Sequence, residues 1–305
     1  MSRTHTSRKI ARSAQTFPVQ KQGLLVYMID PEAYDIVQAI NPHMRNEDGN
    51  LNTVDREKAK VQWQHLKDVY ESIGFSVEVL KAKKDCEDMV FCANQTFPFL
   101  DILNKPSVII SNMANDKRQL ETESVQEQLM GLGINCQALP LRNPDTLFEG
   151  MGDALWVPGR RLICGGYGSR TRKEIYESVK KLSGSSAFLF ELSNPRLYHL
   201  DTCLSILSDK AVLACREGFT EEGWDLLQDI FECVIAVPLT EADAPGFACN
   251  AHSPDARHVI IQRGNAVTCA LLQSAGFMPI EIETDEFIKS GGSVFCMKLQ
   301  TLWDA

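Results

Sequence analysis

Short β-type runs outnumber helical segments by more than two to one along this chain, and this ratio constrains its fold more than any other feature. Apolar residues recur at helical spacing in five segments, residues 54–73, 117–132, 171–182, 220–231 and 265–275. Between them lie short runs of β-type composition, among them GLLVYM, MVFCAN, SVIIS, HVIIQ and SVFCM. A doubly wound sheet would alternate one strand with one helix, which does not match this ratio. We therefore expect an α/β fold of five strand-strand-helix-strand units closed in a ring, with strand ends converging on a central site.

The chain has 305 residues, 44% of them hydrophobic, which suffices for one large domain or two ordinary ones. No stretch rich in Pro, Gly and Ser divides residues 23–299, so we expect residues 23–305 to form a single domain. Residues 1–22 contain basic side chains and no acid. We expect them to form a disordered basic tail; an organelle presequence has a similar composition and is the alternative.

The overall charge and the cysteines exclude several classes of function. The formal net charge of −9 argues against a nucleic-acid-binding surface, and no apolar run approaches the roughly 18 residues that cross a bilayer. The expected partner is therefore a small molecule. Ten cysteines are scattered along the chain without a CxxC pair, which indicates reduced thiols in a cytoplasmic compartment. The cysteines and the six histidines form no recognisable ligand pair, so no metal is expected.

Polar residues interrupt the apolar runs in four groups, INPHM at 40–44, EDMVFCAN at 87–94, FEGMGDALW at 148–156 and YHLDTC at 198–203. In a strand, His199 and Asp201 would point to the same face and into one cavity. Each group also has a plainer explanation. His199 could be a hydrogen-bonded core histidine, Glu149 and Asp153 could be turn residues, and Asn41 before a proline is a common turn starter.

The stretch SGGSVFCMKL, residues 290–299, adds the thiol of Cys296 after two glycines. A buried cysteine in a strand is most often only a small apolar residue. To act as a nucleophile, a thiol with a reference pKa of about 8.5 must become a thiolate. Nearby acids disfavour the thiolate unless the substrate is cationic. A guanidinium or amidinium substrate would pair with the carboxylates and favour the thiolate at the same time.

The motifs INPHM, DMVFCAN, FEGMGDALW, GGYGSRT, YHLDTC, FACNA and FIKSGGSVFC occur in this order along the chain. With them the chain resembles the guanidino-group modifying enzymes, over nearly all of residues 23–299. This superfamily includes arginine deiminases, dimethylarginine dimethylaminohydrolases, amidinotransferases and arginine dihydrolases. The resemblance is greatest to the branch of arginine dihydrolases and bacterial dimethylargininase-like proteins. It implies a five-bladed α/β propeller, the pentein fold, and an enzyme without metal or cofactor.

The resemblance also implies roles for single residues. Cys296 matches the nucleophile of the family, and Gly291 and Gly292 would let the backbone pass close to the substrate. His199 matches the general acid/base, and Glu149 matches the acid that orients it.

Further matches concern the recognition of the substrate. Asp201 and Asn94 match positions that hold the guanidinium, and Ser290 matches a contact beside the nucleophile. The amino-acid end would be bound by Asn41, Arg118 and Arg170, since an arginine fork suits a carboxylate. For the two arginines, a solvated surface charge is the alternative.

Asn94 departs from the deiminases, which have an aspartate here, and is similar to the arginine dihydrolases. An amide donates as well as accepts, so it suits a neutral ureido group as well as a guanidinium. We expect a hydrolase of arginine or an arginine derivative that converts arginine past citrulline to ornithine. The alternatives are a dimethylargininase, an amidinotransferase and a non-catalytic binding protein on the same fold. A closed ring exposes little strand edge, so a homodimer would form through surface patches.

Overall fold

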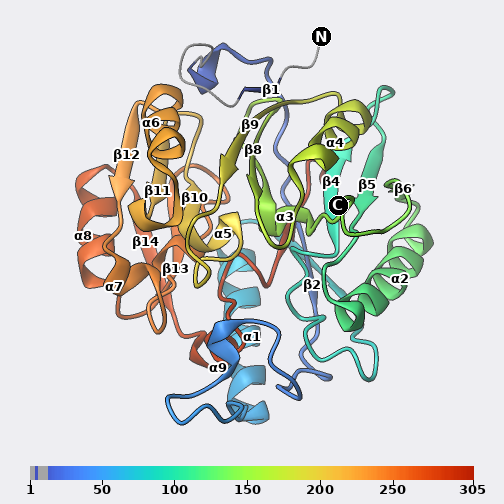
Figure 1. Ribbon diagram of the computed structural model, residues 1–305, viewed down its shortest axis with the longest axis vertical. Coiled ribbons are helices and arrows are strands. Elements are labelled where there is room, and N and C mark those ends of the chain that lie inside the picture. Colours follow the sequence, from blue (N-terminus) through green and yellow to red (C-terminus); the bar gives the residue numbers. More distant parts are fainter. Residues whose placement is uncertain (1–3, 6–12) are drawn as a thin grey trace.

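The computed structural model of the protein describes residues 4–5 and 13–305, in which the strands form five separate sheets (Figure 1). The sheets consist of β15 (Leu299–Gln300), β2 (Leu25–Ile29) and β3 (Ser76–Leu80); β4 (Thr96–Leu100), β5 (Pro106–Ile110) and β6 (Asn135–Ala138); β7 (Ala154–Trp156), β8 (Leu162–Tyr167), β9 (Ser186–Glu191) and β1 (Thr4–His5); β10 (Leu204–Ile206), β11 (Ala211–Ala214) and β12 (Cys233–Ala236); and β13 (His258–Gln262) and β14 (Met278–Ile282).

One pattern repeats in these sheets. Each contains a pair of parallel strands joined through a helix, and in four sheets another strand pairs antiparallel with the first of the two. In the sheet of β13 and β14 a single antiparallel bridge, His252 to Ile260, takes the place of that strand. The leading strand of the first unit is β15, so both ends of the domain meet in one sheet. The strand-strand-helix-strand units expected from the sequence are confirmed.

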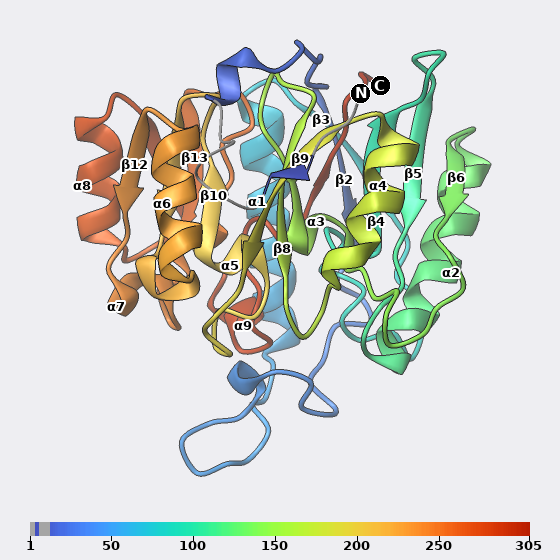
Figure 2. The ribbon, with the colours of Figure 1, turned by 45° about the horizontal axis from the view of Figure 1, so that its top comes forward.

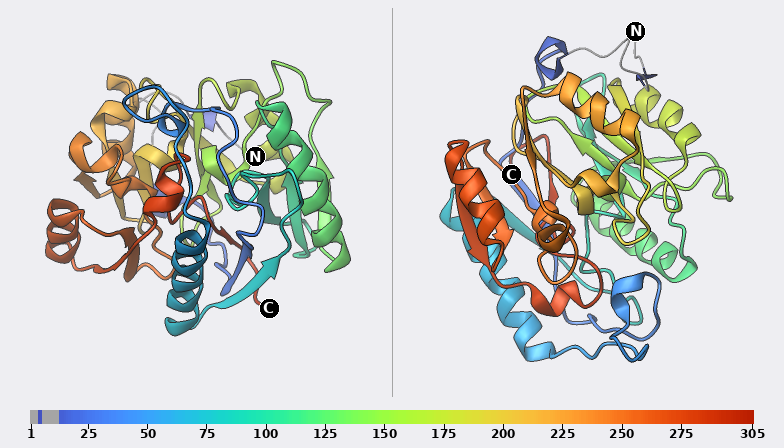
Figure 3. Two further views of the ribbon diagram at one scale, coloured as in Figure 1. Left: turned by 90° about the horizontal axis from the view of Figure 1, so that it is seen from below. Right: turned by 60° about the vertical axis from the view of Figure 1, so that its left-hand side comes forward.

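The five expected helices are confirmed within a few residues at each end. They are α1 (Arg56–Ser72), α2 (Asp116–Gly131), α4 (Tyr176–Ser183), α6 (Glu221–Ile230) and α8 (Ala266–Ser274). Three begin at capping side chains, because Asp55, Asn115 and Thr220 each accept a hydrogen bond from a backbone N–H of the first turn. The helices α8 and α2 lie at opposite sides of the molecule in Figures 1 and 2, and both views of Figure 3 show α1 (blue) and α8 (red-orange) at the outer edge.

Four α-helices of the described part have only four residues each. The sequence pattern missed all four: α3 (Gly150–Asp153), α5 (Leu200–Cys203), α7 (Leu239–Ala242) and α9 (Asp285–Ile288). Figure 1 shows α3 and α5 close together between the sheets, and residues of the two helices are in contact. Four residues make one turn, which is too short to display an apolar stripe.

Two expected strands are wrong. The runs MVFCAN, residues 89–94, and SVFCM, residues 293–297, form buried turns. Both are apolar because they are buried, and a short apolar run does not reveal which backbone conformation buries it. The strand β4 was missed in turn, since Pro98 in its middle argues against a strand.

Residues 13–22 of the expected tail pack against the body. Ala14 is fully buried, the ring of Phe17 contacts Phe188 with centroids 5.6 Å apart, and the Gln20 N–H donates to the Gly159 carbonyl (2.9 Å). The expectation of a disordered tail does not hold for these ten residues, whereas residues 1–3 and 6–12 lie outside the described part. Within the described part, no helix is both long and apolar enough to cross a membrane.

Candidate active site

One cavity with an empty volume of about 300 Å³ is lined by segments far apart in the sequence. Its lining includes Asn41, Asn94, Arg118, Arg170, His199, Ser290 and Cys296. The two other predicted site residues are buried next to the lining, where Glu149 contacts His199 and Asp201 contacts Cys296. The fold therefore brings all the predicted residues into one place.

Cys296 lies in a buried turn between α9 and β15, and the side chain of Asn250 holds this turn. Asn250 Oδ1 accepts hydrogen bonds from the backbone N–H groups of Ser293 (3.0 Å) and Cys296 (3.3 Å), and its Nδ2 donates to Cys296 Sγ (3.2 Å). The thiol in turn donates to Asp201 Oδ2 (3.1 Å). Burial raises the pKa of the Cys296 thiol well above its ordinary value, and the Asp201 carboxylate raises it further. Both effects favour the protonated thiol of Cys296 in the absence of a ligand.

His199 and Glu149 form a buried pair, with Nε2 and Oε2 2.7 Å apart. His199 directly precedes α5 and Glu149 directly precedes α3, so the two short helices place this pair. Burial favours the neutral imidazole, but the carboxylates of Asp153 and Glu149 outweigh it and raise the pKa of His199. Burial alone would raise the pKa of Glu149, yet Arg170 and His199 lower it below its ordinary value. A protonated histidine beside an ionised glutamate is equipped to give up a proton and take it back.

The glycines of FEGMGDALW let α3 approach the other side of the site. A Cβ at Gly150, whose φ is +53°, would lie 2.5 Å from the Thr96 carbonyl oxygen. A Cβ at Gly152 would lie 2.2 Å from Asn94 Nδ2 and 3.3 Å from His199 Nδ1. Only glycine leaves this space, which explains the motif more fully than a turn does.

Asp153 joins α3 to α5. Its Oδ1 accepts a hydrogen bond from the Leu200 N–H (3.0 Å), and its Oδ2 lies 4.0 Å from His199 Nε2. The expectation that His199 and Asp201 share one face of a strand is wrong, because Asp201 belongs to α5. Both residues still serve one site, His199 in the lining and Asp201 behind the thiol.

Asn94 is held in one orientation by Arg118. Arg118 NH1 donates to Asn94 Oδ1 (3.0 Å), and because a guanidinium can only donate, the amide oxygen must face it. Arg118 is itself buried and paired with Glu121, with NH2 3.0 Å from Oε2. Asn94 Nδ2 is buried and has no hydrogen-bond partner within the described residues. The site therefore presents an amide N–H donor that a ligand can use.

Ser290 and Asn41 order the loop in front of Cys296. Asn41 Nδ2 donates to the Ser290 carbonyl (2.8 Å), and Ser290 Oγ accepts from the buried Tyr34 hydroxyl (2.9 Å). Gly291 follows with φ +80°, and a Cβ there would lie 2.8 Å from Asn41 Oδ1 and 3.0 Å from the Tyr198 hydroxyl. The glycine is thus required by both conformation and space.

Arg170 reaches the cavity from the loop after β8. Its NH2 donates to the Ile40 carbonyl (2.6 Å), its NH1 lies 3.3 Å from Glu149 Oε2, and its guanidinium stacks over Tyr198 at 5.0 Å from the ring centroid. These contacts hold a cation in the lining. A solvated surface charge, the alternative considered above, does not describe Arg170 or the buried Arg118.

Sequence reasoning missed Asn250 and Tyr198 and left Asp88 without a role. Asn250 lies in the FACNA motif and Tyr198 in the YHLDTC motif, so their place within a motif was the only sign in the sequence that they belong to the site. Asp88 lines the cavity, and its buried Oδ1 has no hydrogen-bond partner in the part of the chain described. Burial raises the pKa of Asp88 to about 7, against the opposing effect of Arg118. A cation in the cavity would find an acceptor here.

A sequence model of the family described as N,N dimethylarginine dimethylhydrolase, eukaryotic, matches residues 31–302. The chain belongs to this family. It is 31% identical to the N(G),N(G)-dimethylarginine dimethylaminohydrolase of Mycobacterium tuberculosis, over 90% of this chain and 84% of that one. The family resemblance expected from the motifs is confirmed, and this member of the family is a hydrolase of guanidino C–N bonds.

Two further relatives are arginine dihydrolases. The bifunctional arginine dihydrolase/ornithine cyclodeaminase AgrE of Nostoc sp. is 30% identical over 90% of this chain, which spans 37% of its length. This chain superimposes on the crystal structure of the N-terminal domain of ArgZ, a cyanobacterial arginine dihydrolase, bound to substrate, with a TM-score of 0.83 at 28% identity. The match covers 92% of this chain and 98% of that domain. A dimethylarginine dimethylaminohydrolase adduct at 22% identity has the same fold, with a TM-score of 0.73 over 90% of this chain and 98% of that one.

Proposed function

We propose that this family member hydrolyses free arginine twice, through citrulline to ornithine, with Cys296 as the nucleophile. The observation that carries the second step is the orientation of Asn94. Its oxygen is held by Arg118, and its Nδ2 is left without a partner in the cavity. An N–H donor pairs with the carbonyl oxygen of a ureido group, which a guanidinium lacks. The relatives AgrE and ArgZ, named arginine dihydrolases, support the proposal.

The cavity offers a complementary group to each end of arginine. The guanidinium carbon would lie against Cys296, with the Asp201 carboxylate beside its nitrogens. Asn94 Nδ2 is a donor, so it finds an acceptor only after the first hydrolysis, in the ureido oxygen of citrulline. The substrate ammonium group meets the unpartnered Asp88 oxygen and the loop of Asn41, and the carboxylate meets Arg170. Arg118 acts through Asn94, and its direct contact with the amino-acid end stays a prediction.

The first half of the reaction forms a covalent intermediate. The sulfur of Cys296 attacks the guanidinium carbon, and the thiol proton passes to Asp201 Oδ2, which already accepts its hydrogen bond. Burial raises the pKa of Asp201 to about 6, so this carboxylate can hold a proton for the duration of the step. His199 protonates the leaving nitrogen, ammonia departs, and an amidino-thioether remains on the sulfur.

The second half returns the enzyme to its starting state. Water attacks the same carbon and neutral His199 accepts one of its protons. The sulfur then leaves and takes back the proton from Asp201, while the second water proton is released to the solvent as the C=O group forms. The product is citrulline. A second round, with the ureido oxygen on Asn94 Nδ2, releases another ammonia and a carbamate that decomposes to ornithine and carbon dioxide.

The experiment is to incubate the purified protein with arginine and, separately, with dimethylarginine, and to quantify ammonia, citrulline, ornithine and dimethylamine. Two ammonia per ornithine from arginine would support the proposal. Citrulline as the end product would leave the nucleophile assignment intact but refute the role of Asn94. If the product depended on an added amine, the protein would be an amidinotransferase. If neither substrate reacted, it would be a binding protein.

Dimethylarginine is the second candidate substrate, favoured by the family description and by the mycobacterial relative. Hydrolysis would then stop at citrulline, with dimethylamine as the leaving group. Turnover of dimethylarginine without turnover of arginine would establish this second function.

We also propose that the five sheets are the blades of one α/β propeller, the single domain of residues 23–305. The repeated unit and the pairing of β15 with β2 support this arrangement. All ten cysteines are free thiols, which supports a cytoplasmic location. A homodimer through surface patches stays a prediction, and sedimentation of the purified protein would test it.

A further inference from the structure

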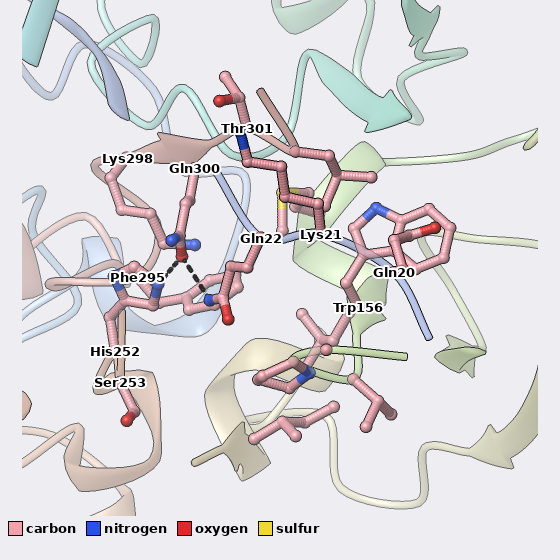
Figure 4. Close-up of a pocket in the computed structure, with 17 residues that line it drawn as sticks. Gln20, Lys21, Gln22, Trp156, His252, Ser253, Phe295, Lys298, Gln300 and Thr301 are labelled. Carbon is pink, nitrogen blue, oxygen red and sulfur yellow. Dashed lines mark hydrogen bonds between the residues drawn. The ribbon is translucent and has the colours of Figure 1, made fainter. Parts of the chain in front are cut away.

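A second cavity, with an empty volume of about 520 Å³, shares no lining residue with the one around Cys296. The segment of residues 20–22, the region around His252 and the chain from Phe295 to Leu302 enclose it (Figure 4). Apolar side chains such as Met151, Trp156 and Ile206 contribute to its wall. Nothing in the reaction described above uses this cavity.

The wall contains a buried lysine without a hydrogen-bond acceptor. Lys298 is fully buried, and its Nζ has no hydrogen-bond partner within residues 13–305. Its Nζ lies 3.2 Å from the centroid of the Phe295 ring, a cation–π contact. Figure 4 shows the Lys298 side chain running beside Gln300 toward Phe295 and His252. A buried ammonium costs free energy unless an anion or several acceptors compensate it.

The side chains of the cavity cannot supply that anion. None of its lining residues is an Asp or a Glu. The Asp201 carboxylate favours the charged form of Lys298 from the side of the first cavity, but it already accepts the hydrogen bond of the Cys296 thiol. Lys21 at the rim is paired with Asp304. Burial lowers the pKa of Lys298 to about 7, as expected for a cation short of partners.

Two other polar side chains of the wall, Ser253 and His252, are uncharged. The hydroxyl of Ser253 is buried without a hydrogen-bond partner among the residues described, and Figure 4 shows it away from the Lys298 amine. His252 is neutral, since burial and Lys298 lower its pKa well below the ordinary value, and its ring nitrogens are occupied by Tyr70 (2.8 Å) and Gln300 (2.9 Å). Lys298 is therefore the group of the wall that can bind an anion.

We propose that this cavity binds a small monocarboxylate, whose carboxylate pairs with Lys298. One lysine matches one negative charge, whereas a dianion would leave a charge buried and unpaired. The apolar part of the wall suits a short hydrocarbon body behind the carboxylate. The site goes beyond the proposed hydrolysis, and its ligand is distinct from arginine, which is recognised by its cationic groups.

The test is calorimetric titration of the full chain with butyrate at pH 7, and with butyramide as a neutral probe of the same shape. Butyrate should bind saturably, and butyramide at least about tenfold more weakly, because it lacks the charge. Lys298→Met should weaken butyrate binding by about 30-fold or more.

Lys180→Met is the matched control. Lys180 is likewise buried, but it is paired with Glu177 and lies outside the cavity, so its removal should leave butyrate binding unchanged. Thermal melting of each variant checks folding. If Lys298→Met does not fold, the comparison of butyrate with butyramide in the unaltered chain decides. Any of three results would overturn the proposal. They are no butyrate binding at millimolar concentrations, equal binding of both probes, and unchanged butyrate binding in a folded Lys298→Met variant.

Discussion

Replacing Glu149 with glutamine should lower the pKa of His199, and the contacts of the pair set the size of the change. The hydrogen bond between His199 Nε2 and Glu149 Oε2 is 2.7 Å long, and it joins two charged groups when the imidazole is protonated. Such a bond contributes about 1.5–3 kcal/mol, against about 0.5–1.5 kcal/mol for a neutral one. The difference, about 1.4 kcal/mol, corresponds to about one pKa unit.

Two further charged neighbours of the pair, Asp153 and Arg170, also contribute to the change in the pKa of His199. Asp153 remains in the variant and continues to favour the imidazolium. Arg170, whose NH1 is 3.3 Å from Glu149 Oε2, loses its partner and disfavours the imidazolium more strongly. The pKa of His199 should therefore fall by at least about one unit.

The assay is the pH dependence of kcat for ammonia release from arginine. The pKa of His199 is raised in the intact site, so the proton needed by the leaving nitrogen is kept to a higher pH, and activity falls as the pH rises through that pKa. In Glu149→Gln this basic limb should move to lower pH by about one unit. Glu121→Gln is the control, because Glu121 is equally buried and paired with a cavity arginine but has no contact with His199. An unmoved limb in Glu149→Gln, or the same movement in both variants, would refute the reasoning.

Three other substitutions test the site. Cys296→Ser should lower turnover by about 10⁴-fold or more while calorimetry still detects arginine binding; near-normal turnover would rule out the nucleophile. Asn94→Asp replaces the free amide donor with an acceptor and should stop the reaction at citrulline, so ornithine in undiminished yield would contradict the role of Asn94. Asn250→Ala leaves the N–H groups of Ser293 and Cys296 without an acceptor, so it should lower the free energy of unfolding by about 2–6 kcal/mol. Urea denaturation measures this change, and an unchanged midpoint would show that Asn250 does not hold the turn.

The long helices were predictable because local sequence determines them. The stripe is clearest in α1, where Ala59, Trp63, Leu66 and Tyr70 are buried along several turns, and side chains such as Asp55 and Thr220 mark where two of the helices begin. The turns at residues 89–94 and 293–297 were not predictable in the same way. Their residues are apolar because the rest of the chain covers them, and that cover comes from distant segments such as Asn250, which is 46 residues from Cys296.

The members of the site were predictable from motifs, whereas their orientation was not. The order of the motifs identified His199 and Asn94, but nothing near Asn94 in the sequence shows which end of its amide faces the cavity. That depends on Arg118, 24 residues away, which fixes the oxygen. Lys298 was passed over for a similar reason, since its lack of a hydrogen-bond acceptor depends on every side chain packed around it.

The charges of the site suggest why a free amino acid should be its substrate. Glu149 is matched by Arg170 and His199, and Glu121 is matched by Arg118. Asp88 and Asp201 have no such direct partner, and burial raises their pKa values to about 7 and about 6. Arginine carries two cations, a guanidinium and an ammonium, which would satisfy both carboxylates. The guanidinium beside Asp201 would also remove one cause of the raised pKa of Cys296, so the nucleophile would become more acidic only when the cationic substrate has bound.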